Sequence, residues 1–177
     1  MYIRTKRIKK GEYGYLVSSK WDKRSNTSKQ KYSQYLGYIF RPQKQFNLQF
    51  KDITKVDDIN NYVEKTPVNV ILKNLVEVDL LNHNFRKNKD KLEIENCYVD
   101  LNNFKIFNEK LKPCVIKLNN GYLCDYTLKN LFNVLPSNTN EFEFGKKLAR
   151  VLIESGISIN NEMFVLLFDK IYKKEVS

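Results

Sequence analysis

The sequence predicts an α+β protein in which a basic, antiparallel N-terminal sheet of three to four strands is followed by a mixed, helix-rich body with a C-terminal helical hairpin. Three observations predict this fold class. Residues 1–50 alternate apolar and polar side chains with the two-residue period of strands. Residues 51–177 contain several segments with the 3.6-residue period of helices. Turn and cap residues separate these segments at the spacing of short elements.

Charge divides the chain at the same place as the periodicity. Residues 1–50 contain 12 of the 31 Lys and Arg residues and two acids, so they carry about +10 of the net charge of +11. They also contain 10 of the 23 aromatic residues. Lys and Arg neutralise phosphates, and aromatic rings on a sheet either form its core or stack on bases. We therefore expect residues 1–50 to bind nucleic acid and residues 51–177 to form a body that supports this region or binds a partner.

The N-terminal region divides into three expected strands. The first covers residues 2–9, and a turn at residues 10–12 uses Gly11 for a positive φ. The second covers residues 13–19 and places Tyr13, Tyr15 and Val17 on one face. Residues 20–29 are polar and are expected to form a long basic loop.

The third expected strand covers residues 31–40 and ends at Arg41-Pro42, because proline cannot donate to a strand ladder. Simple alternation separates its side chains into two sets. Tyr32, Leu36, Tyr38 and Phe40 share one face, whereas Tyr35 and Ile39 share the other. Because both faces carry aromatic residues, the sequence leaves open which face is buried.

The succession of Tyr15-Leu16-Val17, Ser19, a basic loop, Lys29 and Tyr35-Leu36-Gly37 resembles the N-terminal segment of prokaryotic insertion-sequence transposases. In those enzymes this segment precedes a catalytic domain in which three acidic residues bind two metals. The resemblance covers residues 2–40, and the remaining chain is too short for that catalytic domain. It therefore implies contact with DNA and not transposition. Sheets of two or three strands that enter a DNA groove are a known binding mode.

The basic residues of the first hairpin and of the long loop are the expected phosphate contacts. Trp21 at the loop tip, and Tyr13 or Tyr15 if they face outward, would insert into a groove or stack on a base. The complete set of candidate nucleic-acid-binding residues is Arg4, Lys6, Arg7, Lys9, Lys10, Lys20, Trp21, Lys23, Arg24, Lys29 and Lys31.

The first part of the body is expected to be mainly helical. The alternation of residues 46–50 is compatible with a fourth strand of the basic sheet. Thr54 would begin a helix, because Thr54 and Asp57 have the spacing of a capping box. Thr66-Pro67 would begin the next helix, although its second half, residues 76–80, also alternates as a strand does.

Strands are expected in the middle of the body. Residues 84–91 form a basic loop that could add a phosphate contact, and residues 92–101 alternate as one strand. The pattern of residues 104–111 is ambiguous. Residues 114–124 predict a hairpin around Asn119-Asn120-Gly121, since Asn-Gly is a strong hairpin signal.

The C-terminal third is expected to be helical. Asp125 would cap a helix over residues 126–135, and residues 136–140 would form a loop. A helix over 141–155 with Gly156 at its C-cap, and a last helix from Asn160 to Tyr172, both carry apolar stripes. These stripes predict a helical hairpin on the core, or alternatively a homodimer face or a surface for a protein partner.

Several classes of protein do not fit this sequence. It has no apolar run long enough for a membrane span and no signal-peptide pattern, so we expect a cytoplasmic protein without a membrane partner. Phosphate-binding glycine loops and GxSxG are absent. Cys97, Cys114, Cys124 and His83 have the number but not the spacing of zinc ligands, so we expect no metal and no cofactor.

The resulting hypothesis is a non-catalytic nucleic-acid-binding protein, with DNA favoured over RNA. Three alternatives stay open: an RNA-binding or ribosome-associated factor, a protein-interaction module, and a metal-dependent nuclease. The nuclease would need clustered carboxylates for Mg²⁺ and a lysine to orient water. Its candidates are Glu93, Glu95, Asp100, Glu141, Glu143 and Lys146.

Overall fold

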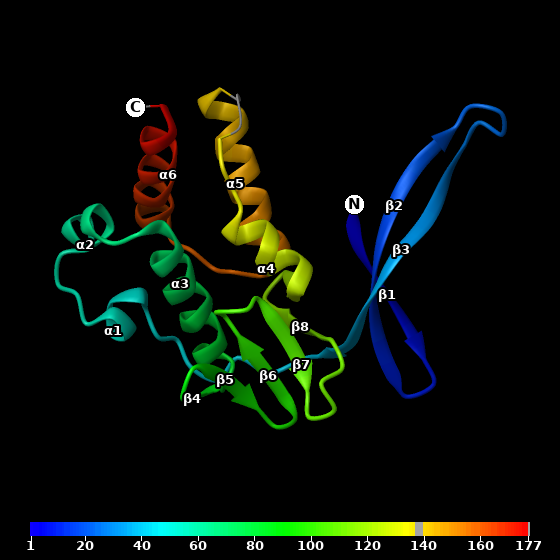
Figure 1. Ribbon diagram of the computed structural model, residues 1–177, viewed down its shortest axis with the longest axis horizontal. Helices are drawn as coiled ribbons and strands as arrows, with labels where there is room; N and C mark the ends of the chain where they lie inside the picture. The colour runs from blue at the N-terminus through cyan, green and yellow to red at the C-terminus, as the bar shows by residue number, and fades with distance from the viewer. Residues whose placement is uncertain (137–139, 177) are drawn as a thin grey trace.

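The computed structural model describes residues 1–136 and 140–176 and confirms the α+β class (Figure 1). Its larger sheet has the strand order β1-β2-β3-β8-β9. All neighbours in it are antiparallel except β3 and β8, which are parallel. The strands are β1 (Tyr2–Ile8), β2 (Gly11–Asp22), β3 (Thr27–Phe40), β8 (Cys114–Leu118) and β9 (Gly121–Leu123). The basic N-terminal strands are therefore continuous with a hairpin of the body.

A smaller antiparallel sheet, with the order β4-β5-β6-β7, lies next to the larger one. A single bridge between Phe107 and Pro113 connects the end of this sheet to the segment that leads into β8. Its strands are β4 (Arg86–Asn88), β5 (Lys91–Ile94), β6 (Cys97–Asp100) and β7 (Lys105–Asn108).

The helices complete the main hydrophobic core, which they form together with β5–β9. The helices are α1 (Phe50–Thr54), α2 (Ile59–Lys65), α3 (Val68–Asn82), α4 (Asp125–Phe132), α5 (Glu141–Ser155) and α6 (Asn161–Val176). A second, smaller cluster lies beneath the basic strands and contains Leu16, Leu36, Ile39, Val115 and Cys124. No helix in the described parts of the chain is long and apolar enough to cross a bilayer.

The hairpin of β2 and β3 is longer than the sequence predicts. The loop is shorter than the predicted 20–29 and covers only residues 23–26, because β2 continues to Asp22 and β3 begins at Thr27. Strand β1 reaches only Val17, so the pairs from Ser18–Lys31 to Asp22–Thr27 form a two-stranded ribbon. Figure 1 shows this ribbon, which we call the arm, projecting away from the body. The polar composition that indicated a loop is that of a ribbon with both faces in solvent.

A bulge at Leu36 and Gly37 reverses part of the predicted alternation of β3. Gly14 pairs with Gly37 and Tyr15 pairs with Tyr35, which leaves Leu36 as an extra residue. As a result Leu36 and Ile39 are both buried, whereas Tyr35 and Tyr38 are both exposed. The predicted grouping of Leu36 with Tyr38 is therefore wrong. The predicted orientation of the Tyr32 side chain lies outside what the structure describes.

The first turn also differs from its prediction. The residue with positive φ is Lys9, at 52°, and Gly11 already belongs to β2. Gly11 has no positive φ. A larger residue there would be limited by space, since a Cβ would lie 2.9 Å from the Tyr13 hydroxyl oxygen.

The start of the body contains three helices and no fourth strand. Residues 46–50 do not form a strand, because the backbone N–H groups of Gln45 and Phe46 bond to the Asn82 carbonyl instead. Thr54 ends α1 and does not begin a helix. Asp58 caps α2 by accepting from the backbone N–H of Asn61 at 3.1 Å. Pro67 precedes α3, which is helical throughout, so the alternative strand at 76–80 is wrong.

The middle of the body has more turns than predicted. Residues 92–101 form two strands, β5 and β6, because Glu95 adopts a left-handed turn conformation with φ 46°. The expected loop at 84–91 contains β4, and the ambiguous segment at 104–111 contains β7. The hairpin around Asn119-Asn120-Gly121 is confirmed as β8 and β9. Asp125 is the first residue of α4 and not its cap, since Cys124 has the extended cap conformation.

The C-terminal helical hairpin is confirmed. Helices α5 and α6 run antiparallel in Figure 1, and the Phe144 ring lies 5.5 Å from Phe168 and 5.9 Å from Tyr172. Gly156 is a left-handed C-cap, and Asn160 accepts from the Met163 N–H at 2.8 Å. Residues 137–139 of the predicted loop lie outside the described residues. The apolar stripes pack within the core, and a homodimer or partner face on these helices stays a prediction.

A buried polar network joins three parts of the body. The Asp79 carboxylate on α3 accepts from the Asn119 side-chain amide at 3.0 Å and from the Ser158 backbone N–H at 2.6 Å. Burial raises the pKa of Asp79, because the charged form is desolvated. The network therefore holds the β8–β9 turn and the α5–α6 connection against α3.

Candidate nucleic-acid interface

The outward face of the β1–β3 sheet carries a row of aromatic side chains. Tyr13 and Tyr15 on β2 pair with Tyr38 and Tyr35 on β3, and cross-strand partners share a face. The ring centroids are 5.5 Å apart for Tyr15 and Tyr35, 5.8 Å for Tyr13 and Tyr38, and 5.2 Å for Tyr38 and Phe40. Tyr35 is 48% exposed and Tyr38 is 39% exposed. Tyr13 and Tyr15 are half-buried beside them, so the row forms a partly solvent-exposed surface and not a core.

The opposite face of the same strands is the buried one. Gly14, Leu16 and Ile39 face the second hydrophobic cluster, which Val115 and Cys124 complete from the body. One face of these strands therefore packs against the body, and the other faces solvent. Burial of this face, and not the other, decides that the tyrosines face outward.

All ten candidate basic residues of the N-terminal region are exposed. Arg4 and Lys6 lie on the aromatic face, since they pair with Tyr15 and Tyr13. The Arg4 guanidinium donates to the Gln30 side chain of β3. Arg7 points to the other face, and Lys9 and Lys10 form the β1–β2 turn. The hairpin thus places cations on both faces and at one end of the aromatic row.

The remaining candidates lie on the arm. Lys20 pairs with Lys29, and Ser18 pairs with Lys31, so these three lysines share one face of the ribbon. Lys29 also forms an ion pair with Asp22 at 2.5 Å. Trp21 lies on the other face, is 57% exposed and pairs with Ser28. Lys23 and Arg24 lie in the tip loop, where the Arg24 backbone N–H donates to the Asp22 carboxylate at 3.0 Å.

Two lysines directly opposite each other on a strand pair are normally unfavourable, because like charges repel. Lys20 and Lys29 occupy such a pair, with only Asp22 as a nearby acid on that face of the ribbon. The Lys29–Asp22 ion pair offsets one of these charges, and the arm keeps an excess of positive charge. Such an arrangement suits a polyanionic ligand.

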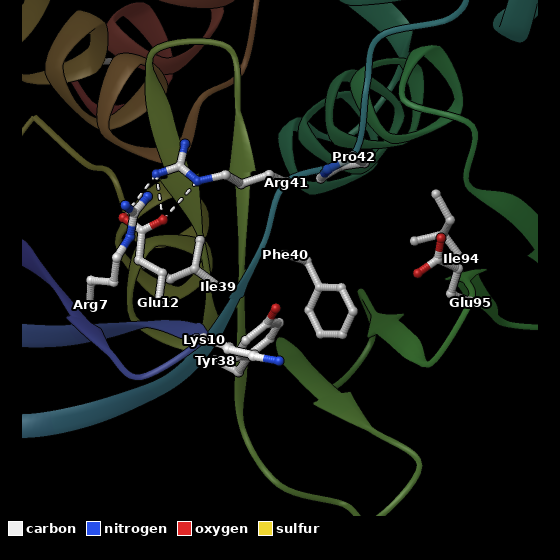
Figure 2. Close-up of a pocket in the computed structure, with 11 residues that line it drawn as sticks. Arg7, Lys10, Glu12, Tyr38, Ile39, Phe40, Arg41, Pro42, Ile94 and Glu95 are labelled. Carbon is white, nitrogen blue, oxygen red and sulfur yellow. Dashed lines mark hydrogen bonds and ion pairs between the residues drawn. The ribbon is translucent and has the colours of Figure 1, made fainter.

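A pocket of about 440 Å³ lies at the end of the aromatic row, next to the β1–β2 turn. Figure 2 shows Phe40 between Lys10 and Tyr38 on one side and Ile94 and Glu95 on the other. The cations that line it are Arg7, Lys10 and Arg41, and its acids are Glu12 and Glu95. The pocket therefore combines an aromatic wall with a net positive rim, which suits a nucleotide or a phosphate.

Arg41 and Glu12, which both line the pocket, form a bidentate pair. The Arg41 Nε and Nη2 atoms donate to the two Glu12 carboxylate oxygens at 2.8 and 2.9 Å (Figure 2). The Arg41 hydrogen bond holds the pKa of Glu12 below its usual value, and Arg7 adds a smaller effect in the same direction. Such a bidentate pair orients the guanidinium plane while leaving other N–H groups for a ligand.

Positive charge also extends onto β8. The Lys117 ammonium lies 4.5 Å from the centroid of the Tyr122 ring. Partial burial lowers the pKa of Lys117, and repulsion from Arg41 lowers it further. Arg7, Arg41 and Lys117 thus approach one another around the single carboxylate of Glu12, so that this side of the sheet favours an added anion.

Two lysines of the basic segment at residues 84–91 make contacts within the protein. Lys87 forms an ion pair with Glu77 at 2.7 Å, and the Lys91 ammonium lies 5.1 Å from the Phe107 ring centroid. These lysines are therefore weaker candidates for phosphate contact than those of the arm.

The nuclease candidates do not come together. Asp100 caps its own turn by accepting from the N–H groups of Asn102 and Asn103, and Glu95 lies in the β5–β6 turn. The two glutamates at 141 and 143 lie in the first turn of α5, where Lys146 pairs with Glu143 at 3.1 Å. Among the residues described, no three His, Cys, Asp or Glu side chains form a group that could hold a metal ion.

The cysteines and the histidine have structural positions. Cys97, Cys114 and Cys124 are buried and free, and burial raises the pKa of each, to about 11 for Cys114. The His83 Nδ1 atom lies 2.7 Å from the Asp79 carbonyl oxygen at the end of α3. These residues pack in the core as small apolar groups or cap a helix.

The candidate binding residues predicted from the sequence lack four residues that the structure brings to this surface. These are Tyr35, Tyr38, Phe40 and Arg41, which the bulge at Gly37 and the end of β3 place beside the basic hairpin. A glycine inside a β-rich run is a signal for a bulge, and it could have indicated the change of face.

Comparisons with protein-family models, with curated proteins and with solved structures gave no match to this chain.

Proposed function

We propose that the protein is a non-catalytic nucleic-acid-binding protein that prefers DNA. The observation that carries the proposal is the outward row of Tyr13, Tyr15, Tyr35 and Tyr38 next to the exposed cations Arg4 and Lys6 and continuous with a basic arm. Exposed aromatic rings on a basic sheet offer stacking to bases and ion pairing to phosphates in one surface.

The preference for DNA follows from the shape of the arm. A two-stranded ribbon fits the major groove of B-form DNA, whereas the deep, narrow major groove of RNA excludes side chains. The arm has this shape and carries Lys20, Lys29 and Lys31 on one face and Trp21 on the other. The resemblance of residues 2–40 to transposase N-terminal segments favours the same ligand.

The test is fluorescence anisotropy of the full chain with duplex DNA, single-stranded DNA and structured RNA over a salt series. The variant Lys20→Ala with Lys31→Ala removes two charges from the arm. On duplex DNA it should reduce the slope of log K against log salt by about 1.8, since each neutralised phosphate contributes about 0.9.

The matched control is Lys51→Ala with Lys65→Ala, which removes the same charge from exposed positions on α1 and α2. These helices lie on the side of the molecule away from the arm (Figure 1). An equal loss of slope in both double variants would show that net charge alone causes binding, and it would contradict the proposal. If no nucleic acid binds at low salt, an acidic protein partner becomes the better explanation for the basic surface.

One observation favours RNA as a second candidate. Single-stranded RNA is recognised by aromatic rings on exposed sheets, and the tyrosine row has this arrangement. Single-stranded RNA is therefore added to the same assay, and tighter binding of either RNA than of every DNA ligand would favour this candidate.

A further inference from the structure

The sheet face and the arm offer two surfaces of different kinds, although both are built from β2 and β3. The sheet face presents the rings of Tyr35 and Tyr38, whereas the arm presents a narrow ribbon with Lys20, Lys29 and Trp21. The two surfaces follow one another along the same pair of strands, as Figure 1 shows. One ligand could therefore contact both at once.

The sheet face suits unpaired bases. In a duplex the bases are stacked on each other and their faces are not accessible, so a protein ring can stack only on an unpaired or flipped base. Tyr15, Tyr35 and Tyr38 form a continuous series of tilted and edge-on rings through Tyr13, and nearly half of Tyr35 is exposed. The pocket with Arg7, Lys10 and Arg41 lies where this row ends.

The arm suits paired nucleic acid. The arm has no row of aromatic rings. Its lysines on one face match the phosphates of a groove, and Trp21 on the other face matches the base edges. From Tyr13 to Trp21 strand β2 extends about 26 Å at about 3.3 Å per residue. This length is sufficient for a few unpaired nucleotides on the sheet and for one groove at the arm.

We propose that the ligand is DNA with a junction between duplex and single strand. The arm enters the groove of the duplex, and the unpaired strand runs over the tyrosine row toward the pocket at the β1–β2 turn. The proposal rests on the nucleic-acid-binding function proposed above and specifies its substrate class. Such a ligand would meet cations at each stage of this path: on the arm, beside the tyrosines and at the pocket. They are Lys20, Lys29 and Lys31, then Arg4 and Lys6, then Lys10 and Arg41.

The experiment compares anisotropy of the full chain with three labelled DNA ligands at one salt concentration. They are a blunt duplex of about 12 base pairs, the same duplex with a single-stranded tail of about six nucleotides at a 5′ or a 3′ end, and the single strand alone. The tailed duplex should bind about tenfold more tightly than the blunt duplex and than the single strand.

Two variants separate the surfaces. Tyr35→Thr with Tyr38→Thr should weaken the tailed duplex far more than the blunt duplex and so remove the advantage of the tail, and threonine keeps the preference for a strand. Lys20→Ala with Trp21→Ala should weaken both duplex ligands far more than the single strand. Phe142→Ala is the control for the tyrosine variant, since Phe142 is an aromatic residue on α5 that is 69% exposed.

The outcomes distinguish this inference from the proposed function. If tailed and blunt duplexes bind equally, or if the tyrosine variant weakens both to the same extent, the junction proposal is wrong while DNA binding stands. If the single strand binds as tightly as the tailed duplex, the arm has no role and the proposal is also wrong. If none of the three ligands binds, the proposed function itself fails. Urea denaturation of each variant shows whether it keeps the fold.

Discussion

Gly37 lies at the bulge that brings Tyr35 and Tyr38 to the same face of β3, and its replacement by alanine should destabilise the whole protein. Gly37 adopts φ +120° at the bulge of β3, a conformation that side chains with a Cβ rarely adopt. A Cβ at this position would also lie 1.9 Å from the Pro113 carbonyl oxygen, next to β8. The only parallel pairing of the larger sheet, between β3 and β8, begins at the next residue, where Tyr38 pairs with Cys114.

The magnitude follows from these two effects. An unfavourable backbone conformation of this kind costs about 1–3 kcal/mol. The contact adds to it, because the distance must rise from 1.9 Å to the ordinary minimum of 3.4 Å, and a backbone atom has to move. Overpacking in a well-ordered core costs about 1–3 kcal/mol more. We therefore expect Gly37→Ala to lower the free energy of unfolding by about 2–6 kcal/mol.

Urea denaturation followed by circular dichroism measures this change, and Gly145→Ala is the matched control. Gly145 lies inside α5, where a Cβ would meet the Phe168 ring at an ordinary 3.6 Å. This substitution should raise the free energy of unfolding by about 0.5–1 kcal/mol, since alanine favours a helix more than glycine does. A loss of less than about 0.5 kcal/mol in Gly37→Ala would refute the reasoning about the bulge.

Three further predictions concern the body and the pocket. Asp79→Asn should lower the free energy of unfolding in urea by about 1–3 kcal/mol. Both carboxylate oxygens of Asp79 accept from N–H donors, and the asparagine NH₂ group would face one of these donors. Unchanged stability would show that the network is dispensable. Glu12→Gln should cost about 1 kcal/mol or less, as expected for an exposed pair. The pKa of Glu12 is lowered in the folded state. The stabilisation by the Glu12–Arg41 pair is therefore complete above the ordinary pKa of about 4.5 and is lost as the pH falls through the lowered pKa. A stability difference between wild type and variant that grows toward acid pH would contradict this sign. The three cysteines should react with a thiol reagent at pH 8 only after unfolding, since all are buried and their pKa values are raised; rapid labelling of the native protein would disprove their burial.

Local patterns were sufficient to predict the elements whose signals lie within a few residues. The Asn119-Asn120-Gly121 hairpin, the left-handed cap at Gly156 and the two C-terminal helices all follow from turn chemistry, caps and apolar periodicity. The predictions were wrong where a local composition signal competed with strand pairing. The polar composition of residues 20–29 indicated a loop, but strand pairing of β2 with β3 continues through most of it.

The sequence by itself determined the fold class and the concentration of positive charge and aromatic rings in residues 1–50, because composition and periodicity are properties of short segments. The tertiary structure alone decided which face carries the tyrosines, since burial of Leu16 and Ile39 depends on Val115 and Cys124 from the body. It also decided the pocket, which joins the β1–β2 turn to the β5–β6 turn. Pairing between residues far apart in the chain, such as β3 with β8, leaves no local signal, and for that reason the sequence could not predict it.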